Sequence, residues 1–415
     1  MGSRIIGVGS ALPEMIVTND DLSQYVETDD EWITSRTGIR ERHIALDETT
    51  TSLGVDAARR ALGIEAGGWC ANSTPLDPES LDLIIAMTVS PDMIVPSQAA
   101  LYKAELGATH AVAYDLNAAC AGCVYGMDTA ASLLELSAVT STLEHAAAGY
   151  ASSLHLAKRN TYKRALIIGA DRMSRVTDWT DRATCVLFGD GAGAVVLEWQ
   201  DNDCGVLASR LVNIDDVKHA LNLANTFDLS TFPFANPVKA AGERSVAALT
   251  INNGTVASVV TDAVANTLSH AGSQEAGADI PDACRDEYCA CTDEYEGAIQ
   301  PTITMKGAAV FKFSTKVMAS CVREVLERAD MDIDDIDLVV PHQANERIIV
   351  SAMKKLGLPL DIIHLTIDTV GNTSASSALI ALADAYTKGK ITPGSIVCMV
   401  GFGGGLTAGA VLFRA

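Results

Sequence analysis

The sequence predicts an α/β protein made of two similar halves. Short apolar segments typical of buried strands alternate with segments of helical periodicity. LDLIIAMTVS (81–90) is echoed by IDLVVPHQAN (336–345), and CVLFGDGAGAVVLEW (185–199) is echoed by SIVCMVGFGGGLTAGAVLF (395–413). Because such echoes keep their order along the chain, they indicate a duplicated unit. We therefore expect mostly parallel sheets that helices cover on both faces.

The expected elements follow one another regularly. RIIGVG (4–9) reads as a strand, and SQAALYKAELG (97–107) reads as a helix that ends at Gly107. RALIIGAD (164–171) is a buried strand, and residues 185–199 read as two strands joined by a glycine turn.

Composition limits the class of protein. The 415 residues are 48% hydrophobic, so the chain can bury a large core, and its formal net charge is −22. Such a surface disfavours nucleic acid and anionic membranes as partners, and an acidic partner would need a local basic patch. Ten cysteines are too sparse for a disulfide scaffold, and no run approaches membrane-spanning length. We expect a cytoplasmic protein with reduced thiols.

A strand-to-helix corner in DLNAACAGCVYGMDTAASLLEL (115–136) carries the candidate nucleophile. Cys120 stands where the helix begins, and the unpaired backbone N–H groups there favour thiolate over thiol. Cys123, one turn further along, is interpreted as a core residue. The alternative is that both cysteines are simply small buried apolar side chains. The second half has a matching corner in residues 363–386, where Asn372 precedes the helix.

Four corners of this kind are expected to meet. Ligands of open α/β sheets bind beyond the carboxyl ends of the strands, and these ends carry Cys120, His342, Asn372 and the glycines of GFGGG (401–405). Pseudo-symmetry places Cys120 and Asn372 at equivalent corners that can face each other. His342 could instead be structural, Asn372 could cap its helix, and GFGGG could be only a tight turn.

A basic segment near the N-terminus is a candidate ligand entrance. In EWITSRTGIRERH, Arg36, Arg40 and Arg42 lie close to Trp32. Arginine and tryptophan together can hold a ligand that carries a phosphate and a base, by ion pairing and stacking. The alternative is a solvated basic turn with a half-buried tryptophan.

Two regions interrupt the repeat. Residues 66–80 are loop-like, and residues 213–300 are polar, acidic and weakly periodic. Cys284, Cys289 and Cys291 in the second region lack the two-residue spacing that is usual for zinc. We therefore expect a surface insertion and no metal site.

Taken together, seven motifs resemble the β-ketoacyl-acyl-carrier-protein synthase III family, the thiolase-fold condensing enzymes that start type II fatty-acid synthesis. They are, in order, TNDDL, DEWITSRTGIRERHIA, DLNAACAG, TDRATCVLFGDGAGAVVL, PHQANERII, TVGNTSAS and GFGGGLTAG. They cover the chain except for roughly 66–80, 138–155 and 213–300, which look like insertions. The resemblance implies duplicated βαβαβαββ halves at 1–205 and 206–415, in a layered α-β-α-β-α arrangement, and a homodimer.

The resemblance also implies a reaction and a set of site residues. A cysteine takes the acyl group from acyl-CoA, and malonyl-acyl-carrier protein then loses carbon dioxide and attacks it to give a 3-oxoacyl-carrier protein. The implied residues are Cys120, His342 and Asn372 for catalysis, Cys120 and Gly404 for the oxyanion hole, Trp32, Arg36, Arg182, Asn345, Phe402 and Val95 for substrate binding, and Gln343, Ala344, Asn345, Glu346, Arg347 and Lys312 for the carrier protein. No metal or redox cofactor is implied.

Val95 bears on the choice of acyl group. In the resembled family this position reaches across the dimer and closes the far end of the acyl pocket, with a large aromatic side chain in members that favour acetyl. Valine leaves room for a longer acyl chain, unless a neighbour such as Met93 fills the space.

Three alternative functions remain open from the sequence. Cys120, His342 and Asn372 also follow the Cys…His…Asn order of papain-like hydrolases, although no C-G-S-C-W surrounds Cys120. Another thiolase-fold synthase could make a specialised 3-oxoacyl or hydroxymethylglutaryl-type product. A non-catalytic acyl-binding protein is disfavoured by the complete triad.

Overall fold

The computed structural model describes residues 2–72, 74–146, 160–201, 203–216, 219–223 and 302–415. Every element below belongs to the unit formed by residues 1–223 and 302–415. The predictions for Cys284, Cys289 and Cys291 lie outside the described residues. None of the described helices combines the length and apolarity needed to cross a bilayer.

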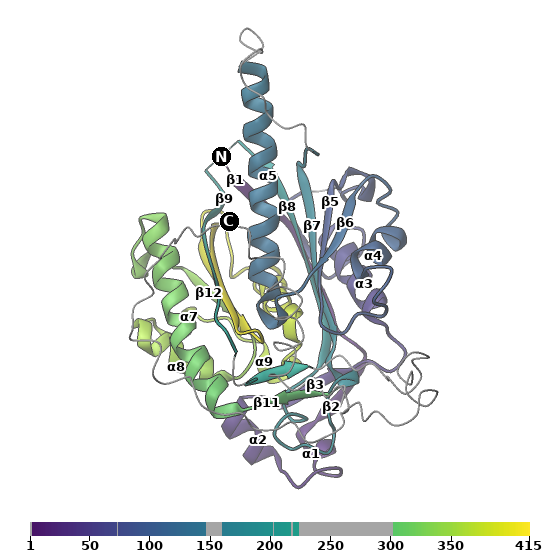
Figure 1. Ribbon diagram of the computed structural model, residues 1–415, viewed down its shortest axis with the longest axis vertical. Helices are drawn as coiled ribbons and strands as arrows, with labels where there is room; N and C mark the ends of the chain where they lie inside the picture. Colours follow the sequence, from purple (N-terminus) through teal and green to yellow (C-terminus); the bar gives the residue numbers. More distant parts are fainter. Residues whose placement is uncertain (1, 73, 147–159, 202, 217–218, 224–301) are drawn as a thin grey trace, which may run out of the picture. The chain divides into compact units, whose positions relative to one another are not determined.

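Two mixed sheets form the framework (Figure 1). The first has six strands in the order β4 (Trp69–Cys70), β1 (Gly2–Ala11), β8 (Asp190–Gln200), β7 (Arg164–Arg172), β5 (Leu83–Met87) and β6 (Val112–Leu116). The second has four, in the order β12 (Leu338–Pro341), β13 (Ile396–Gly403), β14 (Thr407–Arg414) and β9 (Gly205–Asn213).

The prediction of mostly parallel sheets is wrong. Only β5 with β6, β5 with β7, and β12 with β13 are parallel pairs, and the remaining pairs of the two large sheets are antiparallel. The short turn between β13 and β14 requires antiparallel pairing, because a parallel connection needs a long crossover.

Helices cover both faces of each sheet and give five layers. α3 (Thr50–Ala61) and α4 (Gln98–Leu106) pack on the outer face of the six-stranded sheet, while α7 (Gly307–Ala329) and α8 (Glu346–Leu356) cover the outer face of the four-stranded sheet. α5 (Gly122–Ala146) and α10 (Ser377–Thr387) touch both sheets and lie between them (Figure 1). The predicted α-β-α-β-α arrangement is confirmed.

The middle layer explains why these two helices are so apolar. A helix that packs against a sheet on either side has little surface for water, so its composition is hydrophobic around its circumference. Small residues such as Ala121, Ala130, Ala378 and Ala381 let the two sheets approach closely, and each is fully buried in the central core. The corners that carry Cys120 and Asn372 lie just before these two helices.

The two central helices begin in the same way, which supports the duplication. The side chain of Asn117 accepts a hydrogen bond from the N–H of Ala119 at 3.0 Å, and the side chain of Asn372 accepts one from the N–H of Ser374 at 2.9 Å. Ala119 and Ser374 both have positive φ, at 47° and 56°. Cys120 follows directly after Ala119, so its counterpart in the second half is the residue after Ser374.

Two predicted strands do not form. Residues 185–199 were expected to form two strands joined by a glycine turn, but only the second forms, as part of β8. Before it, the side chain of Asp181 accepts hydrogen bonds from the N–H of Ala183 and the hydroxyl of Thr184, which favours a turn. Residues 363–366 meet the sheet at one bridge only, between Ile363 and Val339.

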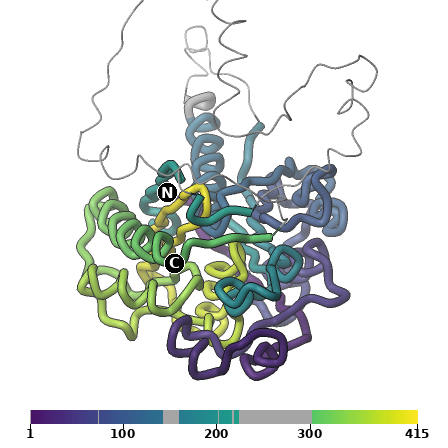
Figure 2. The backbone as a smooth tube through the Cα atoms, turned by 60° about the horizontal axis from the view of Figure 1, so that its bottom comes forward, coloured from purple at the N-terminus to yellow at the C-terminus, as the bar shows by residue number. Residues whose placement is uncertain are grey.

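Smaller elements gather at one end of the layers, the end that comes forward in Figure 2. They are β2 (Met15–Thr18), α1 (Asn19–Leu22), α2 (Asp30–Thr37), β3 (Glu41–Ile44), β10 (Leu221–Leu223), β11 (Ile303–Met305) and α9 (Ile367–Val370). Leu22, Ile33, Met173, Ile303 and Ile367 form a separate small core among them. This end contains the carboxyl ends of β5, β7 and β12.

Two segments thought to be insertions have some regular structure. Residues 66–80 include the edge strand β4, and α5 continues to Ala146, so the first part of the expected insertion at 138–155 lengthens this helix.

Candidate active site

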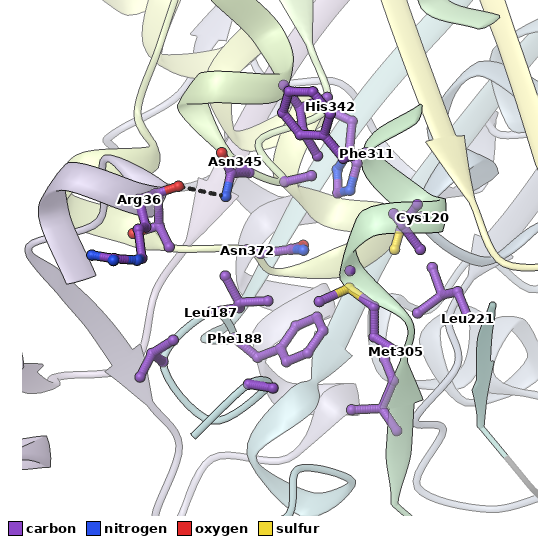
Figure 3. Close-up of a pocket in the computed structure, with 18 of the residues that line it drawn as sticks. Arg36, Cys120, Leu187, Phe188, Leu221, Met305, Phe311, His342, Asn345 and Asn372 are labelled. Carbon is purple, nitrogen blue, oxygen red and sulfur yellow. Dashed lines mark hydrogen bonds between the residues drawn. The ribbon is translucent and has the colours of Figure 1, made fainter. Parts of the chain in front are cut away.

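A cavity of about 190 Å³ opens at this end of the molecule, and it brings the predicted triad together. Cys120, His342 and Asn372 all line it, although they come from the corner before α5, the end of β12 and the corner before α10 (Figure 3). Phe402 of β13 lines the same cavity.

Cys120 is buried and protonated at rest. Its Sγ lies 3.5 Å from the hydroxyl of Ser374, and 7% of the residue is exposed. Burial raises the pKa of the Cys120 thiol to about 11, and the negative charge of Asp171 adds to the rise. Burial thus opposes the thiolate that the start of the helix is expected to favour, because loss of solvation disfavours the charged form.

The glycine-rich turn approaches the backbone of Cys120 closely. A Cβ added to Gly403 would stand 2.6 Å from the N of Cys120, so only glycine fits there. The hydroxyl of Thr407 lies 2.9 Å from the carbonyl oxygen of Ala118 and 3.0 Å from that of Gly404, which ties the two segments together. The sequence pointed to the glycines of GFGGG as a group, and the structure shows that Gly403 is the one that approaches Cys120 most closely.

His342 is neutral and fixed in orientation. Burial lowers the pKa of its imidazole to about 3. Its Nδ1 lies 2.6 Å from the hydroxyl of Ser377, which also accepts the backbone N–H of Gln343 at 3.1 Å. In these contacts the hydroxyl of Ser377 accepts one hydrogen bond and donates its own proton to Nδ1. The hydrogen of the neutral ring is therefore on Nε2. The ring of Phe402 meets the imidazole edge-on, with centroids 5.3 Å apart.

Asn372 presents a donor to the cavity. Its side-chain oxygen is occupied by the N–H of Ser374, so its NH₂ group is the end left for a ligand. Its own backbone is fixed by bonds to Leu187 and Gly189. The site therefore offers two neutral hydrogen-bond donors beside one thiol.

The cavity mouth has the predicted aromatic and basic character. The guanidinium of Arg182 stacks on the ring of Trp32 at 3.9 Å from its centroid, and that of Arg36 lies at 4.6 Å. The side chain of Asn345 donates to the carbonyl oxygen of Arg36 at 3.0 Å and so joins α2 to the start of α8 (Figure 3).

Apolar side chains that the motifs did not reveal complete the wall. Leu221 of β10, Ile303 and Met305 of β11, and Phe188 lie around the cysteine side of the cavity. No sequence signal identified the two short strands, because β10 lies within the weakly periodic region 213–300 and β11 comes directly after it.

The residues expected to meet a carrier protein divide into two groups. Arg347 and Lys312 are exposed, and Asn345 and Glu346 are half-buried. Gln343 is only 1% exposed, because its amide bonds to the backbone of Pro341, His364 and Thr366. Ala344 is buried as well and lines the cavity, so these two cannot form a docking surface.

Val95 does not line the cavity in this chain. It is 84% exposed, in a loop between β5 and α4. Across the described ranges, no three His, Cys, Asp or Glu side chains are grouped to hold a metal ion.

Comparison with known proteins decides the family. Models described as 3-oxoacyl-[acyl-carrier-protein] synthase III, and as the C-terminal part of that enzyme, match residues 143–214 and 326–415. The β-ketoacyl-[acyl-carrier-protein] synthase III of Clostridium acetobutylicum is 35% identical over 411 residues, covering 99% of this chain and 98% of the relative. The chain belongs to the β-ketoacyl-acyl-carrier-protein synthase III family.

Further members agree with this assignment. The synthase III of Caldanaerobacter subterraneus is 37% identical over 408 residues, which cover 98% of this chain and 96% of the relative. The crystal structure of the synthase III from Aquifex aeolicus matches with a TM-score of 0.72 at 34% identity, over 100% of both chains. The chain is therefore a condensing enzyme of type II fatty-acid synthesis, as the motifs predicted, and the hydrolase alternative is not favoured.

Proposed function

We propose that this synthase III transfers an acyl group from acyl-CoA to Cys120 and then condenses it with malonyl-acyl-carrier protein, giving a 3-oxoacyl-carrier protein and carbon dioxide. The observation that carries the assignment of roles is that one cavity is lined by a thiol and two neutral hydrogen-bond donors. The direct test is the intact mass of the protein after incubation with a panel of acyl-CoA thioesters, followed by product analysis with malonyl-carrier protein.

In the first step, Cys120 attacks the thioester carbonyl. The backbone N–H groups of Cys120 and Gly404 receive the oxyanion, and the close approach of Gly403 to Cys120 supports this arrangement. The carbon–sulfur bond to coenzyme A breaks, and the acyl group remains on Cys120.

In the second step, the thioester oxygen of malonyl-carrier protein accepts hydrogen bonds from Nε2–H of His342 and from the amide of Asn372. Loss of carbon dioxide leaves an enolate on this oxygen, and neutral donors stabilise it without a competing negative charge. Phe402 keeps water from the departing carboxylate. The carbanion then attacks the acyl group and releases Cys120.

The coenzyme A entrance lies at Trp32. Arg182 already stacks on this ring, so a flat base that enters must slide between the two or displace the guanidinium. Arg36, on the same helix as Trp32, supplies charge for the phosphates. Coenzyme A acts here as part of the substrate, and we propose that the enzyme uses no metal or redox cofactor.

We also propose that the enzyme is a cytoplasmic homodimer of chains that each contain two halves, 1–205 and 206–415. β6 pairs only with β5 in the part of the chain described, so its other edge is available to a partner strand. The loop after β5 exposes Met93, Ile94 and Val95 together. Such an apolar cluster is typical of an interface.

The loop that carries Val95 is anchored at both ends. The carboxylate of Asp92 accepts the N–H groups of Thr50 and Thr51 at the start of α3, and the side chain of Gln98 bonds to the N–H of Asp92 and to Thr51. The tip is therefore held away from its own chain, which suits a role in the partner's acyl pocket.

Val95→Phe is expected to narrow the range of acyl groups. Wild-type enzyme should use a four-carbon or longer acyl-CoA at least as well as acetyl-CoA, because valine leaves room for additional methylenes. Each buried methylene contributes about 0.8 kcal/mol, so two or three shift the preference by roughly one to two orders of magnitude. Values of kcat/KM across straight and branched acyl-CoA substrates test this. A wild-type enzyme that strongly prefers acetyl-CoA would contradict it.

A basic rim is proposed to dock the acidic carrier protein. Lys312 follows Phe311 and Arg347 precedes Ile348, and both of these apolar neighbours line the cavity, so the two cations stand at its rim. Lys316, Lys354 and Lys355 continue this basic rim along α7 and α8, and all three are exposed. Although the chain has a net charge of −22, such a rim attracts the acidic carrier protein locally.

Arg347→Glu is expected to raise KM for malonyl-carrier protein several-fold while acyl transfer from acyl-CoA stays near wild type. The matched control is Lys163→Glu, an equal change of charge at an exposed position before β7, at the far end of the sheet. Steady-state kinetics at low and moderate salt provide the measurement. Equal losses on both substrates would argue against a docking rim.

A further inference from the structure

The proton of Cys120 must leave before the sulfur can attack, and the triad supplies no ready acceptor. His342 binds a proton only near pH 3, since burial lowers the pKa of its imidazole to about 3, and its Nδ1 already contacts Ser377. Asn372 has no basic atom. The Cys120 sulfur instead contacts another group, the hydroxyl of Ser374, at 3.5 Å.

Ser374 leads to a buried carboxylate. Asp171 at the end of β7 is 0% exposed, and its Oδ2 lies 3.2 Å from the N–H of Ala375, the residue after Ser374. A hydrogen bond with the side chain of Ser374 also lowers the pKa of the same carboxyl group. A continuous path therefore runs from the thiol, through one hydroxyl, to a carboxylate that is sealed from water.

The other oxygen of Asp171 is fixed in place. Oδ1 accepts the hydroxyl of Thr88 at 2.9 Å, the N–H of Val89 at 2.7 Å, and both the hydroxyl and the N–H of Ser90 at 3.0 and 3.2 Å. The four donors saturate Oδ1, which leaves Oδ2 as the atom to accept a proton. Burial raises the pKa of Asp171, and the hydrogen bonds act against that rise.

We propose that Asp171 is the proton acceptor for Cys120 and that Ser374 relays the proton between them. The S–H bond of Cys120 breaks as a new O–H bond forms on Ser374, whose original proton moves to Oδ2 of Asp171. The thiolate attacks the acyl-CoA carbonyl, and the coenzyme A thiolate that leaves takes a proton from solvent. This inference rests on the proposed acyl transfer to Cys120.

The same path closes the catalytic cycle. While Cys120 is acylated its sulfur cannot accept a proton, so the proton stays on Asp171 and the carboxyl group is neutral. When the carbanion attacks, Cys120 leaves as a thiolate, and the relay runs backward to restore the thiol and the carboxylate. A neutral Asp171 also avoids adding a negative charge near the enolate during decarboxylation.

Two readings of Asp171 give opposite predictions. The titratable groups that face Cys120 are Asp171 from β7, Cys123 from α5 and His342 after β12, and burial raises the pKa of Cys123 to about 12. If Asp171 acts only through its charge, Asp171→Asn lowers the pKa of Cys120 and speeds its alkylation. If it is the acceptor, the same change slows both alkylation and acylation.

The pH profile separates the relay from direct ionisation. With the relay, acylation requires ionised Asp171, so the rate reaches a plateau once this carboxyl group has lost its proton. Without it, the rate follows the thiolate population and rises about tenfold per pH unit toward the thiol pKa, which burial raises to about 11. His342 and Cys123 do not titrate between pH 6 and 9.

The experiment compares Ser374→Ala, Ser374→Gly and the control Ser376→Ala. Ser374 has a φ of 56°, which alanine tolerates poorly and glycine tolerates well, so an equal loss in both variants identifies the hydroxyl as the cause. Among the described residues, the hydroxyl of Ser376 bonds only to Thr373, and Ser376→Ala should keep the wild-type profile. The variant Asp171→Asn is also measured, after circular dichroism has shown that it is folded.

Acylation is measured in single turnovers from pH 6 to 9, and alkylation by iodoacetamide over the same range. Both Ser374 variants should acylate at least about 100-fold more slowly at pH 7, the size of a lost proton transfer, and should lose the plateau. Wild-type rates in either variant, or faster alkylation in Asp171→Asn, would overturn the relay. Because iodoacetamide needs no acyl-CoA, a wild-type enzyme that is alkylated but never acylated would instead refute the proposed function.

Discussion

We expect the variant Cys120→Ser to form no covalent acyl-enzyme. A hydroxyl is far less ionised than a thiol, and the buried site gives the serine no compensating solvation. Intact-mass analysis after incubation with acyl-CoA should show the acyl increment on wild-type protein and none on the variant. Turnover should fall to the background rate.

The matched control for that experiment is Cys70→Ser. Cys70 lies half-buried on the edge strand β4 and does not line the cavity, so this variant should gain the acyl group normally. Acylation of Cys120→Ser at a rate near wild type would show that the nucleophile is elsewhere.

His342→Ala and Asn372→Ala are expected to separate the two steps of the reaction. Each should still form acyl-enzyme, because neither side chain supplies the oxyanion hole of the first step. Each removes one donor to the enolate, and loss of one such donor costs about 100- to 1,000-fold in rate. Carbon dioxide release from malonyl-carrier protein measures the second step directly.

His110→Ala serves as the histidine control, since His110 is an exposed side chain at the opposite end of the sheet, before β6. Condensation near the wild-type rate in either His342→Ala or Asn372→Ala would disprove the assigned role. Loss of acyl-enzyme formation in both would mean that these residues act in the first step instead.

The corners of the site could be predicted because each is encoded locally. A short apolar strand followed by small residues and a helical pattern is visible around Cys120 and again around Asn372. The carboxyl ends of parallel strands meet at one edge, and β6, β7 and β12 accordingly bring the Cys120 corner, Asp171 and His342 to one end of the layers.

Other features could not be predicted because they depend on partners far along the chain. Gln343 follows His342 in a motif that was expected to face the carrier protein. Its side-chain amide instead donates to the carbonyl oxygen of His364 and accepts the N–H of Thr366. The first of the two strands expected in residues 185–199 does not form, because Ala183 and Thr184 donate hydrogen bonds to the side chain of Asp181. The position of Ser374 and Ala375 beside Asp171 depends on how the turn before α10 packs on β7, which no local pattern records.

The corners at Asn117 and Asn372 have matching backbone turns but contribute different groups to the site. Both asparagines hold the same turn, but Asn117 is exposed while Asn372 lines the cavity, and only the first corner is followed by a cysteine. The two corners therefore contribute different groups to the site, a thiol after the first and an amide donor at the second. Residues of both halves line the cavity, so neither half expressed by itself contains the complete site.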